Sequence, residues 1–213
     1  MSTIQLNSKD FASQTSSAEP VIASGVTGSP ALASVNMTGL GLSFINTTTA
    51  SGSTDNILTP NDTFTSTYEN YWVTLHDYFQ SGDGENVNLY FTVAGTATTT
   101  WNYWYSMDAH KASANAEYTF AGRDAGFVYV TPNQDDGTAN SLTYQWLVTQ
   151  PKTTSGYATG IGVGIFHHNS TFEGAGSHCF GYRTTTAFDG IKITTASGTI
   201  TAGSKLSVYG ITN

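Results

Sequence analysis

The residues best suited to bind a metal ion are gathered between positions 167 and 179. They are His167, His168, Glu173, His178 and Cys179. A metal site needs several nitrogen, oxygen or sulfur ligands that converge on one point. Adjacent residues of a strand point to opposite faces, so His167 and His168 cannot easily share one ion. We therefore expect polar or interface histidines here and no cofactor, although a trimer axis could gather three copies of one histidine.

A second group of residues has the chemistry of a sugar-binding surface. The segment Trp101-Asn102-Tyr103-Trp104-Tyr105 offers aromatic faces that stack on sugar rings and an amide that can fix hydroxyl groups. In a strand, Trp101, Tyr103 and Tyr105 would share one face, opposite Asn102 and Trp104. One face must then fill the core, so we favour core or trimer packing over an exposed glycan contact. The candidate contacts to a glycan or a neighbouring subunit are Trp101, Tyr103, Trp104, Tyr105, His167 and His168.

The remaining polar residues give little support to catalysis. Asp83 with Glu85, and Asp135 with Asp136, could offer oxygens to calcium, which takes about six to eight of them. Neither turn has the EF-hand pattern, so we expect solvated turn carboxylates. The chain also lacks a G-x-S-x-G elbow, a phosphate-binding loop and an H-E-x-x-H motif. We predict a protein without enzymatic activity or cofactors.

The charge, the cysteine content and the apolar runs of the chain limit the kinds of partner and location that we expect. Only 10% of the 213 residues are charged, and the net charge is −8, which disfavours binding to nucleic acid. The single cysteine, Cys179, allows no disulfide within the chain. The first residues, MSTIQLNSKDF, lack the features of a signal peptide, and no apolar run approaches the ~18 residues of a membrane span. We expect neither export by a standard signal nor membrane insertion.

Strands must position these side chains, because apolar residues recur with a period of two and no segment has a clear helical period. We expect each alternating set to face the core of an antiparallel, jelly-roll-like β-sandwich. The three clearest sets are Val87, Leu89, Phe91 and Val93; Leu142, Tyr144, Trp146 and Val148; and Tyr157, Thr159, Ile161, Val163 and Ile165.

Glycine-bearing segments between these runs predict tight turns with positive φ. The predicted turns are Ser81-Gly82-Asp83-Gly84, Asp135-Asp136-Gly137, Asp189-Gly190 and Ser197-Gly198. The first 60 residues differ, since Ser, Thr, Ala and Gly dominate and apolar runs are short. We divide the chain into residues 1–60, an N-terminal arm with a role in attachment or a set of edge strands, and residues 61–213, the β-sandwich.

Two stretches of the chain resemble a β-sandwich domain found in virion proteins of tailed phages, particularly marine phages. The first is FTSTYENYWVTLHDYFQSGDGENVNLYFTV, residues 64–93, and the second is FDGIKITTASGTITAGSKLSVYGI, residues 188–211. The positions that carry the resemblance are Tyr68, Asn70, Tyr71, Asn86, Leu89, Tyr90, Asp189, Gly190, Ser197, Gly198, Gly203, Tyr209 and Gly210. We expect this chain to differ from long fibre members in lacking a shaft or large anchoring domain before the sandwich.

The resemblance implies a structural role on the particle exterior, commonly as a trimer and without catalytic residues. We therefore expect a homotrimeric capsid decoration or appendage protein, with another virion protein of the head or tail as its partner. The alternative is a tail-fibre or receptor-binding tip that recognises host surface glycan. A more distant alternative is a glycan-degrading enzyme.

Overall fold

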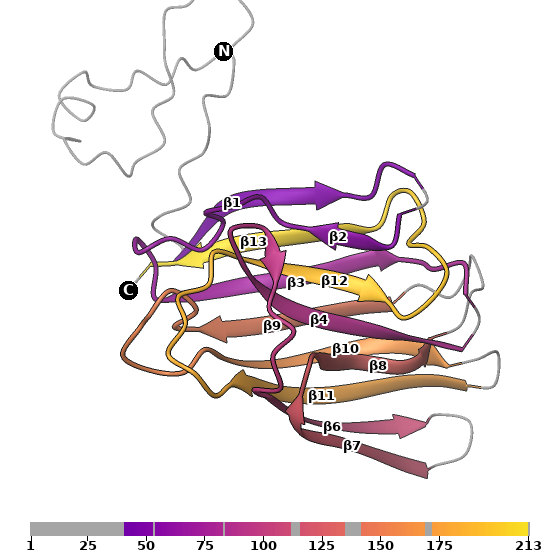
Figure 1. The fold of residues 1–213 in the computed structure, drawn as a ribbon. Helices are drawn as coiled ribbons and strands as arrows, with labels where there is room; N and C mark the ends of the chain where they lie inside the picture. The colour runs from indigo at the N-terminus through magenta and orange to yellow at the C-terminus, as the bar shows by residue number, and fades with distance from the viewer. Residues whose placement is uncertain are drawn as a thin grey trace, which may run out of the picture.

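The strands of this protein form a two-layered β-sandwich (Figure 1). A computed structural model describes residues 41–52, 54–82, 84–111, 116–134, 142–168 and 172–212. Within these ranges there is no helix, and hence none long and apolar enough to cross a membrane. The strands are β1 (Leu42–Thr49), β2 (Asn56–Leu58), β3 (Asn70–Tyr78), β4 (Glu85–Val93), β5 (Thr96–Ala97), β6 (Tyr103–Lys111), β7 (Ala116–Ala125), β8 (Val128–Gln134), β9 (Leu142–Thr149), β10 (Thr159–His168), β11 (Phe172–Tyr182), β12 (Gly190–Thr195) and β13 (Lys205–Ile211).

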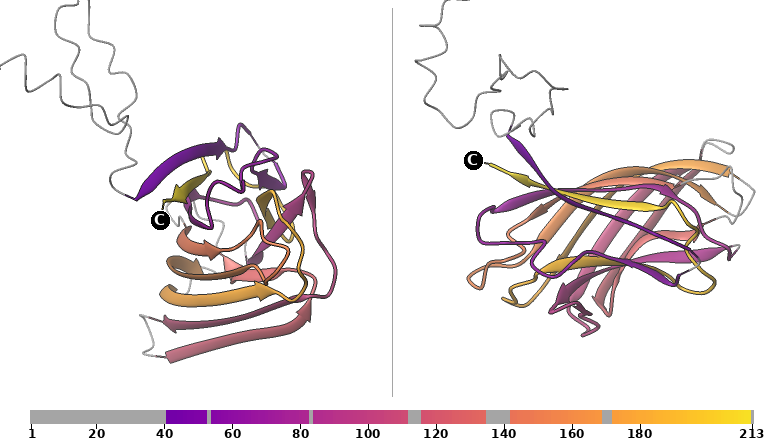
Figure 2. Two further views of the ribbon diagram at one scale, coloured as in Figure 1. Left: turned by 90° about the vertical axis from the view of Figure 1, so that its left-hand side faces the viewer. Right: turned by 90° about the horizontal axis from the view of Figure 1, so that it is seen from above.

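The larger layer has the strand order β1-β13-β3-β9-β10-β11-β6-β7, and the smaller has β2-β12-β4-β8. The short strand β5 pairs with the end of β4. All of these pairings are antiparallel, and a single pair between His168 and Gln134 joins the layers at one corner. Figure 2 shows the two layers from the side and from above. The prediction of an antiparallel β-sandwich is confirmed.

The core between the layers is unusually aromatic. Ten of the twelve largest fully buried side chains are Trp, Tyr or Phe. Tyr144 and Trp146 stack with ring centroids 5.3 Å apart, and Phe91 stacks on Phe188 at 4.7 Å. A tyrosine hydroxyl in a core normally finds a polar partner, and the Tyr103 hydroxyl accepts a hydrogen bond from the Phe91 amide at 2.8 Å. Much of the aromatic content therefore serves the interior of one chain.

Two of the three alternating runs face the core as predicted. On β9, Leu142, Tyr144, Trp146 and Val148 are all fully buried. On β4, Val87, Leu89 and Phe91 are buried, and only Val93, at the strand end, is exposed.

The third run was assigned to the wrong face. Ile161, Val163 and Ile165 of β10 are 60%, 50% and 58% exposed and lie on the outer surface of the larger layer. Tyr157 precedes β10 and is also exposed. The intervening glycines face the core instead, for the steric reason given below.

The predicted turns had mixed outcomes. Gly84 and Gly198 have φ of 71° and 73°, the left-handed conformation that glycine adopts without strain. Asp189-Gly190 is not such a turn, because Gly190 begins β12 and Asp189 is buried. The Asp189 carboxylate accepts hydrogen bonds from the Thr92 hydroxyl at 3.1 Å and the Ala94 amide at 2.5 Å. The Asp135-Asp136-Gly137 turn lies outside the described residues.

The segment before residue 61 contributes two edge strands. β1 pairs with β13 at the edge of the larger layer, and β2 pairs with β12 at the edge of the smaller one. The part of the proposed arm that precedes residue 41 lies outside the described residues.

Candidate functional site

The aliphatic residues of β10 face outward because its inner positions leave no room for side chains. Gly160, Gly162 and Gly164 occupy these positions, and aromatic rings from the neighbouring strands lie against them. An added Cβ would collide with Phe180 of β11 at Gly160 and with Tyr144 of β9 at Gly164. The rings of β9 and β11 thus fill the core above β10, and the larger side chains of β10 take the outer face.

An apolar row crosses the outer face of the larger layer at the level of Ile161. The strand register places one residue from each of six adjacent strands in this row. Its members are Phe44, Tyr209, Trp72, Leu147, Ile161 and Cys179. Phe44 is 61% exposed and packs edge-on against Tyr209, with ring centroids 5.6 Å apart. Side chains in register across a sheet contact one another, so the row is continuous.

Among the residues whose side chains the structure describes, the centre of this outer face carries no charged group. We define the central outer face as the middle of β9, β10 and β11 on this side, which comprises Thr143, Gln145, Leu147, Thr149, Thr159, Ile161, Val163, Ile165, Ala175, Ser177 and Cys179. None of them is Asp, Glu, Lys, Arg or His. Charges begin toward the edges of the layer, for example where Lys205 donates to the Asp77 carboxylate at 3.3 Å. A surface without charges loses little hydration free energy when a partner covers it.

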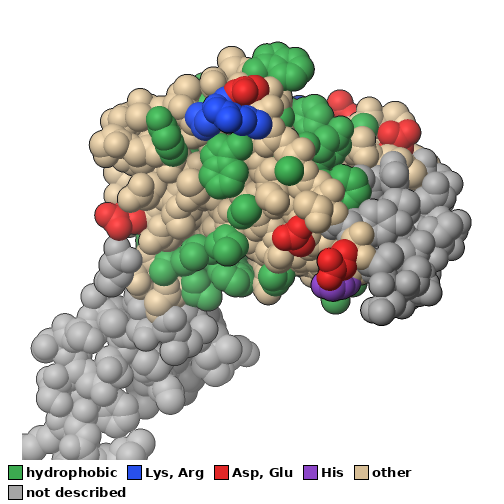
Figure 3. All heavy atoms as spheres, turned by 90° about the horizontal axis from the view of Figure 1, so that it is seen from below, with side chains coloured by type: hydrophobic (Ala, Val, Ile, Leu, Met, Phe, Trp, Pro, Cys, Tyr) green, Lys and Arg blue, Asp and Glu red, His purple; other side chains and the backbone are tan. Residues whose placement is uncertain are grey.

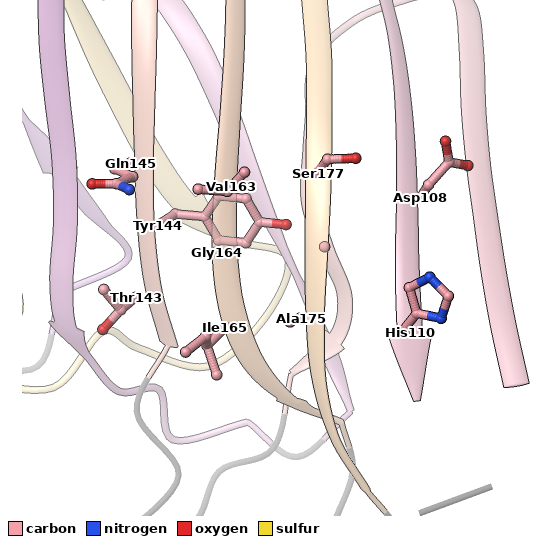
Figure 4. A pocket seen from close by; sticks show the side chains of 11 residues that line it. Asp108, His110, Thr143, Tyr144, Gln145, Val163, Gly164, Ile165, Ala175 and Ser177 are labelled. Carbon is pink, nitrogen blue, oxygen red and sulfur yellow. The ribbon is translucent and has the colours of Figure 1, made fainter. Parts of the chain in front are cut away.

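A shallow groove of about 610 Å³ runs over the central outer face (Figure 4). Val163 and Ile165 of β10 and Ala175 of β11 form its apolar part. Asp108 and His110 of β6 line the opposite side, where both side chains are exposed. The Asp108 carboxylate accepts a hydrogen bond from the Thr119 hydroxyl at 3.0 Å. The groove therefore joins the aliphatic centre of the face to a polar margin.

The aromatic segment before and within β6 is split among three environments. Trp101 lies in the turn before the strand and is 75% exposed. Tyr103 and Tyr105 are buried, and Trp104 lies on the outer side, over Gly181 of β11. Tyr103 thus packs within the core of one chain and is not available to a ligand at the surface.

Trp101 and Tyr105 also line a cleft that the sequence interpretation missed. The cleft holds about 350 Å³ and is lined by residues of β4 and β8 and of β6 and β7, together with the turns beside them. Its lining, which we call the aromatic cleft, is Tyr90, Thr99, Trp101, Tyr105, Ala125, Gly126, Phe127 and Tyr129. The alternation of Phe127 and Tyr129 around the buried Val128 was the sequence signal that could have indicated this surface.

The tyrosine hydroxyl groups in the aromatic cleft stay protonated at neutral pH. Burial raises the pKa of Tyr105 to about 12. Burial also raises the pKa of Tyr90, against a smaller effect of its hydrogen bond to Thr194. Both phenols therefore act as neutral hydrogen-bonding groups.

The potential metal ligands do not converge in the described part of the chain. His178 is buried beneath β11, whereas Cys179 lies on the opposite face. His178 accepts a hydrogen bond at Nδ1 from Trp146 Nε1 at 3.3 Å, and burial lowers its pKa to about 4. The side chains of His167, His168 and Glu173 are not among those described. No group of three or more His, Cys, Asp or Glu side chains in the described ranges could hold a metal.

The acidic turns give no further ligand set. Glu85 begins β4, whereas Asp83, Asp135 and Asp136 lie outside the described residues.

Comparisons of the chain with protein-family models, curated proteins and solved structures found no match.

Proposed function

We propose that this chain is a non-enzymatic structural protein of the exterior of a tailed-phage particle, where it forms a homotrimer and decorates the capsid or an appendage. The observation that carries the assembly is the central outer face, which exposes three aliphatic side chains of one strand and no charge. Contiguous exposed apolar surface of this kind typically marks an interaction site.

The free energies of apolar burial and of association indicate how large the contact between subunits must be. Burying a Val or Ile side chain fully contributes about 1.5–3 kcal/mol, so covering the exposed halves of Ile161, Val163 and Ile165 contributes roughly 3 kcal/mol. Association of two proteins costs an estimated ~4–15 kcal/mol in lost freedom. The β10 residues alone are therefore insufficient, and the contact must extend along the apolar row toward Phe44.

The apolar row offers the required width. Six strands spaced about 4.8 Å apart span roughly 25 Å, which accommodates an interface of about 800 Å² per partner. The aromatic content of the chain gives no separate support for a trimer, because so many of its rings fill the core.

The assignment to a phage particle rests on the resemblance carried by residues 64–93 and 188–211. Both stretches supply sandwich strands: β3 and β4 come from the first, and β12 and β13 from the second. They supply four strands of the framework, whereas β9, β10 and β11, which bear the central outer face, lie between them. The assignment to a phage particle is thus an analogy based on the framework strands. In this proposal the partner on the particle is another virion protein of the head or tail.

Light scattering of the purified full chain tests the assembly, because it measures mass in solution. We expect a particle of three times the 22.6 kDa chain mass at micromolar concentration. Val163→Lys places a charge in the centre of the contact and should yield monomers. The matched control is Val93→Lys, at an exposed valine of the smaller layer, which should leave the trimer intact. A wild-type monomer, or a trimer that survives Val163→Lys, would contradict the proposed assembly.

A further inference from the structure

The aromatic cleft contains a hydroxyl group without a partner, on the almost fully buried side chain of Tyr105. Tyr105 is only 7% exposed; its ring lies over Gly122 of β7 and packs edge-on against Tyr129, with ring centroids 5.6 Å apart. In the described part of the chain the Tyr105 hydroxyl makes no hydrogen bond. A buried hydroxyl without a partner costs free energy, and a ligand that supplies the missing hydrogen bond removes that cost.

The turn before β6 adds an exposed indole to the same cleft. Trp101 is the most exposed of the large apolar side chains in the described ranges, at 75%. The next residue, Asn102, donates its amide to the Thr100 carbonyl at 2.7 Å, and its own carbonyl accepts from the Arg183 amide at 3.0 Å. Because these backbone hydrogen bonds hold the turn in place, little freedom is lost when a ligand covers the indole.

The lining of the aromatic cleft suits a ligand that has both apolar C–H faces and hydroxyl groups. The negative face of an aromatic ring attracts polarised C–H groups, which a hexose presents on its flat sides. Phe127 packs against Tyr129 and Tyr90, with ring centroids 4.9 and 6.0 Å apart, so this part of the lining is firm. The hydroxyls of Tyr105 and Thr99 can each donate and accept a hydrogen bond. A volume of about 350 Å³ lies at the small end of ligand pockets, as expected for a short saccharide.

The charge around the cleft favours a neutral ligand. Among the described residues, no side chain that lines the aromatic cleft is charged. Arg123 of β7 pairs in register with Trp104 on the outer face of the larger layer, whereas Tyr105 points inward. Figure 3, which views the molecule from the side of β6 and β7, shows hydrophobic side chains in patches and charged ones in small groups between them. A charged ligand would therefore lose hydration without forming an ion pair. A quaternary ammonium, which aromatic cages accept, would also leave the Tyr105 hydroxyl without a partner.

We propose that the aromatic cleft binds a neutral saccharide through a hexose ring. Trp101 stacks on the flat face of the ring, and the Tyr105 hydroxyl forms a hydrogen bond with a hydroxyl group of the sugar. This site is separate from the proposed contact between subunits, because Tyr105 lies on the inner side of the larger layer and Val163 on its outer side.

A glycan array tests the proposal on the full-length protein. The array carries neutral glucosides, galactosides and mannosides beside their sialylated and uronic acid analogues, and we expect the neutral glycans to be retained. For a retained glycan, calorimetric titration should give at least about a tenfold weaker Kd for Trp101→Ala, the loss typical of a dominant aromatic contact. Tyr105→Phe removes only the hydroxyl and should weaken the Kd about threefold to tenfold, the range for one neutral hydrogen bond. Because that hydroxyl has no partner in the free protein, the urea midpoint of Tyr105→Phe should stay unchanged.

The matched control for Trp101→Ala is Tyr157→Ala, which removes an exposed ring that lines neither the aromatic cleft nor the apolar row and should not change the Kd. Val163→Lys should also keep the wild-type Kd while it abolishes the trimer, so a failure of the proposed assembly is distinguishable from a failure of the cleft. Circular dichroism of each variant separates lost binding from lost folding.

The proposal is overturned if the array retains no neutral glycan, or if either Trp101→Ala or Tyr105→Phe binds with the Kd of the wild type. Retention of the acidic analogues alone would also contradict it. Binding of choline or of a proline-rich peptide through Trp101, without any retained glycan, would assign the aromatic cleft to another ligand and overturn the proposal as well.

Discussion

Strands β9 and β10 are neighbours with the same alternating pattern, yet they present their large side chains to opposite sides of the sheet. On β9, Tyr144 and Trp146 are fully buried, whereas on β10 Val163 and Ile165 are at least half exposed. The register pairs Tyr144 with Gly164 and Trp146 with Gly162, so each large ring lies against a glycine. Alternation thus specifies the period of a strand, and the volume available inside decides which half of the pattern is buried.

The largest expected effect on stability comes from removing a buried ring of β9. Trp146→Ala should lower the free energy of unfolding by about 3–5 kcal/mol, because it removes a fully buried ring and leaves a cavity. Urea unfolding followed by circular dichroism measures the change. Ile165→Ala, on the exposed side of β10, is the matched control and should stay within about 0.5 kcal/mol in monomeric protein. Equal losses in the two variants would show that β10 is buried after all.

Acid should destabilise the same interior through His178, which is buried against the uncharged side chains of Tyr144, Trp146 and Phe180. Its pKa is about 4 in the folded chain, against an ordinary value of 6.5. The unfolded chain therefore binds a proton first, and stability falls as pH drops from about 6.5 to about 4. The full loss is roughly 3 kcal/mol.

Denaturant unfolding at pH 7 and at pH 4.5 measures this effect. His178→Gln keeps a polar group near Trp146 but does not titrate, so its stability should fall less over this range than that of the wild type. Identical pH dependence in the two proteins would mean that His178 is not held neutral by burial.

A methyl group at an inner glycine of β10 tests the steric explanation directly. Gly162→Ala should cost about 1–3 kcal/mol, because its Cβ would collide with the carbonyl oxygen of Gln145 and the indole of Trp146. Gly52→Ala is the control, since no atom lies within 4 Å of its added Cβ. Thermal unfolding of the two variants should differ clearly, and a Gly162→Ala protein as stable as the control would contradict the close approach.

The smallest expected effect is that of making β10 polar on its outer side. Ile161→Thr keeps a β-branched side chain on an exposed strand face, so monomer stability should change by less than about 0.5 kcal/mol. The measurement is urea unfolding in the Val163→Lys background, where trimer formation should be absent. A loss above about 2 kcal/mol there would indicate a structural role for Ile161 within one chain.

The sequence predicted the fold well because alternation and turn glycines are local signals. The faces of β4 and β9 followed directly from their apolar residues, but the face of β10 depended on rings from β9 and β11, which the sequence of β10 does not contain. Gly160, Gly162 and Gly164 at every second position were the available clue. Asp189 was misassigned for a similar reason, since its hydrogen-bond partners Thr92 and Ala94 are far away in the chain.

The aromatic cleft was only partly predictable. Trp101 and Tyr105 belong to one aromatic segment and were found, whereas Tyr90, Phe127 and Tyr129 come from β4, the β7–β8 turn and β8. Their meeting depends on the pairing of β8 with β4 and of β6 with β7, which no local pattern encodes.

The most direct test of the proposed assembly surface uses Cys179, the single cysteine, which lies in the apolar row and pairs in register with Ile161. The rate at which a maleimide reagent modifies its thiol should be low at concentrations where the trimer forms. It should rise at least about tenfold on dilution to monomers, and Val163→Lys should react fast at every concentration. A rate that is independent of concentration and equal in the two proteins would contradict the claim that this face is the contact between subunits.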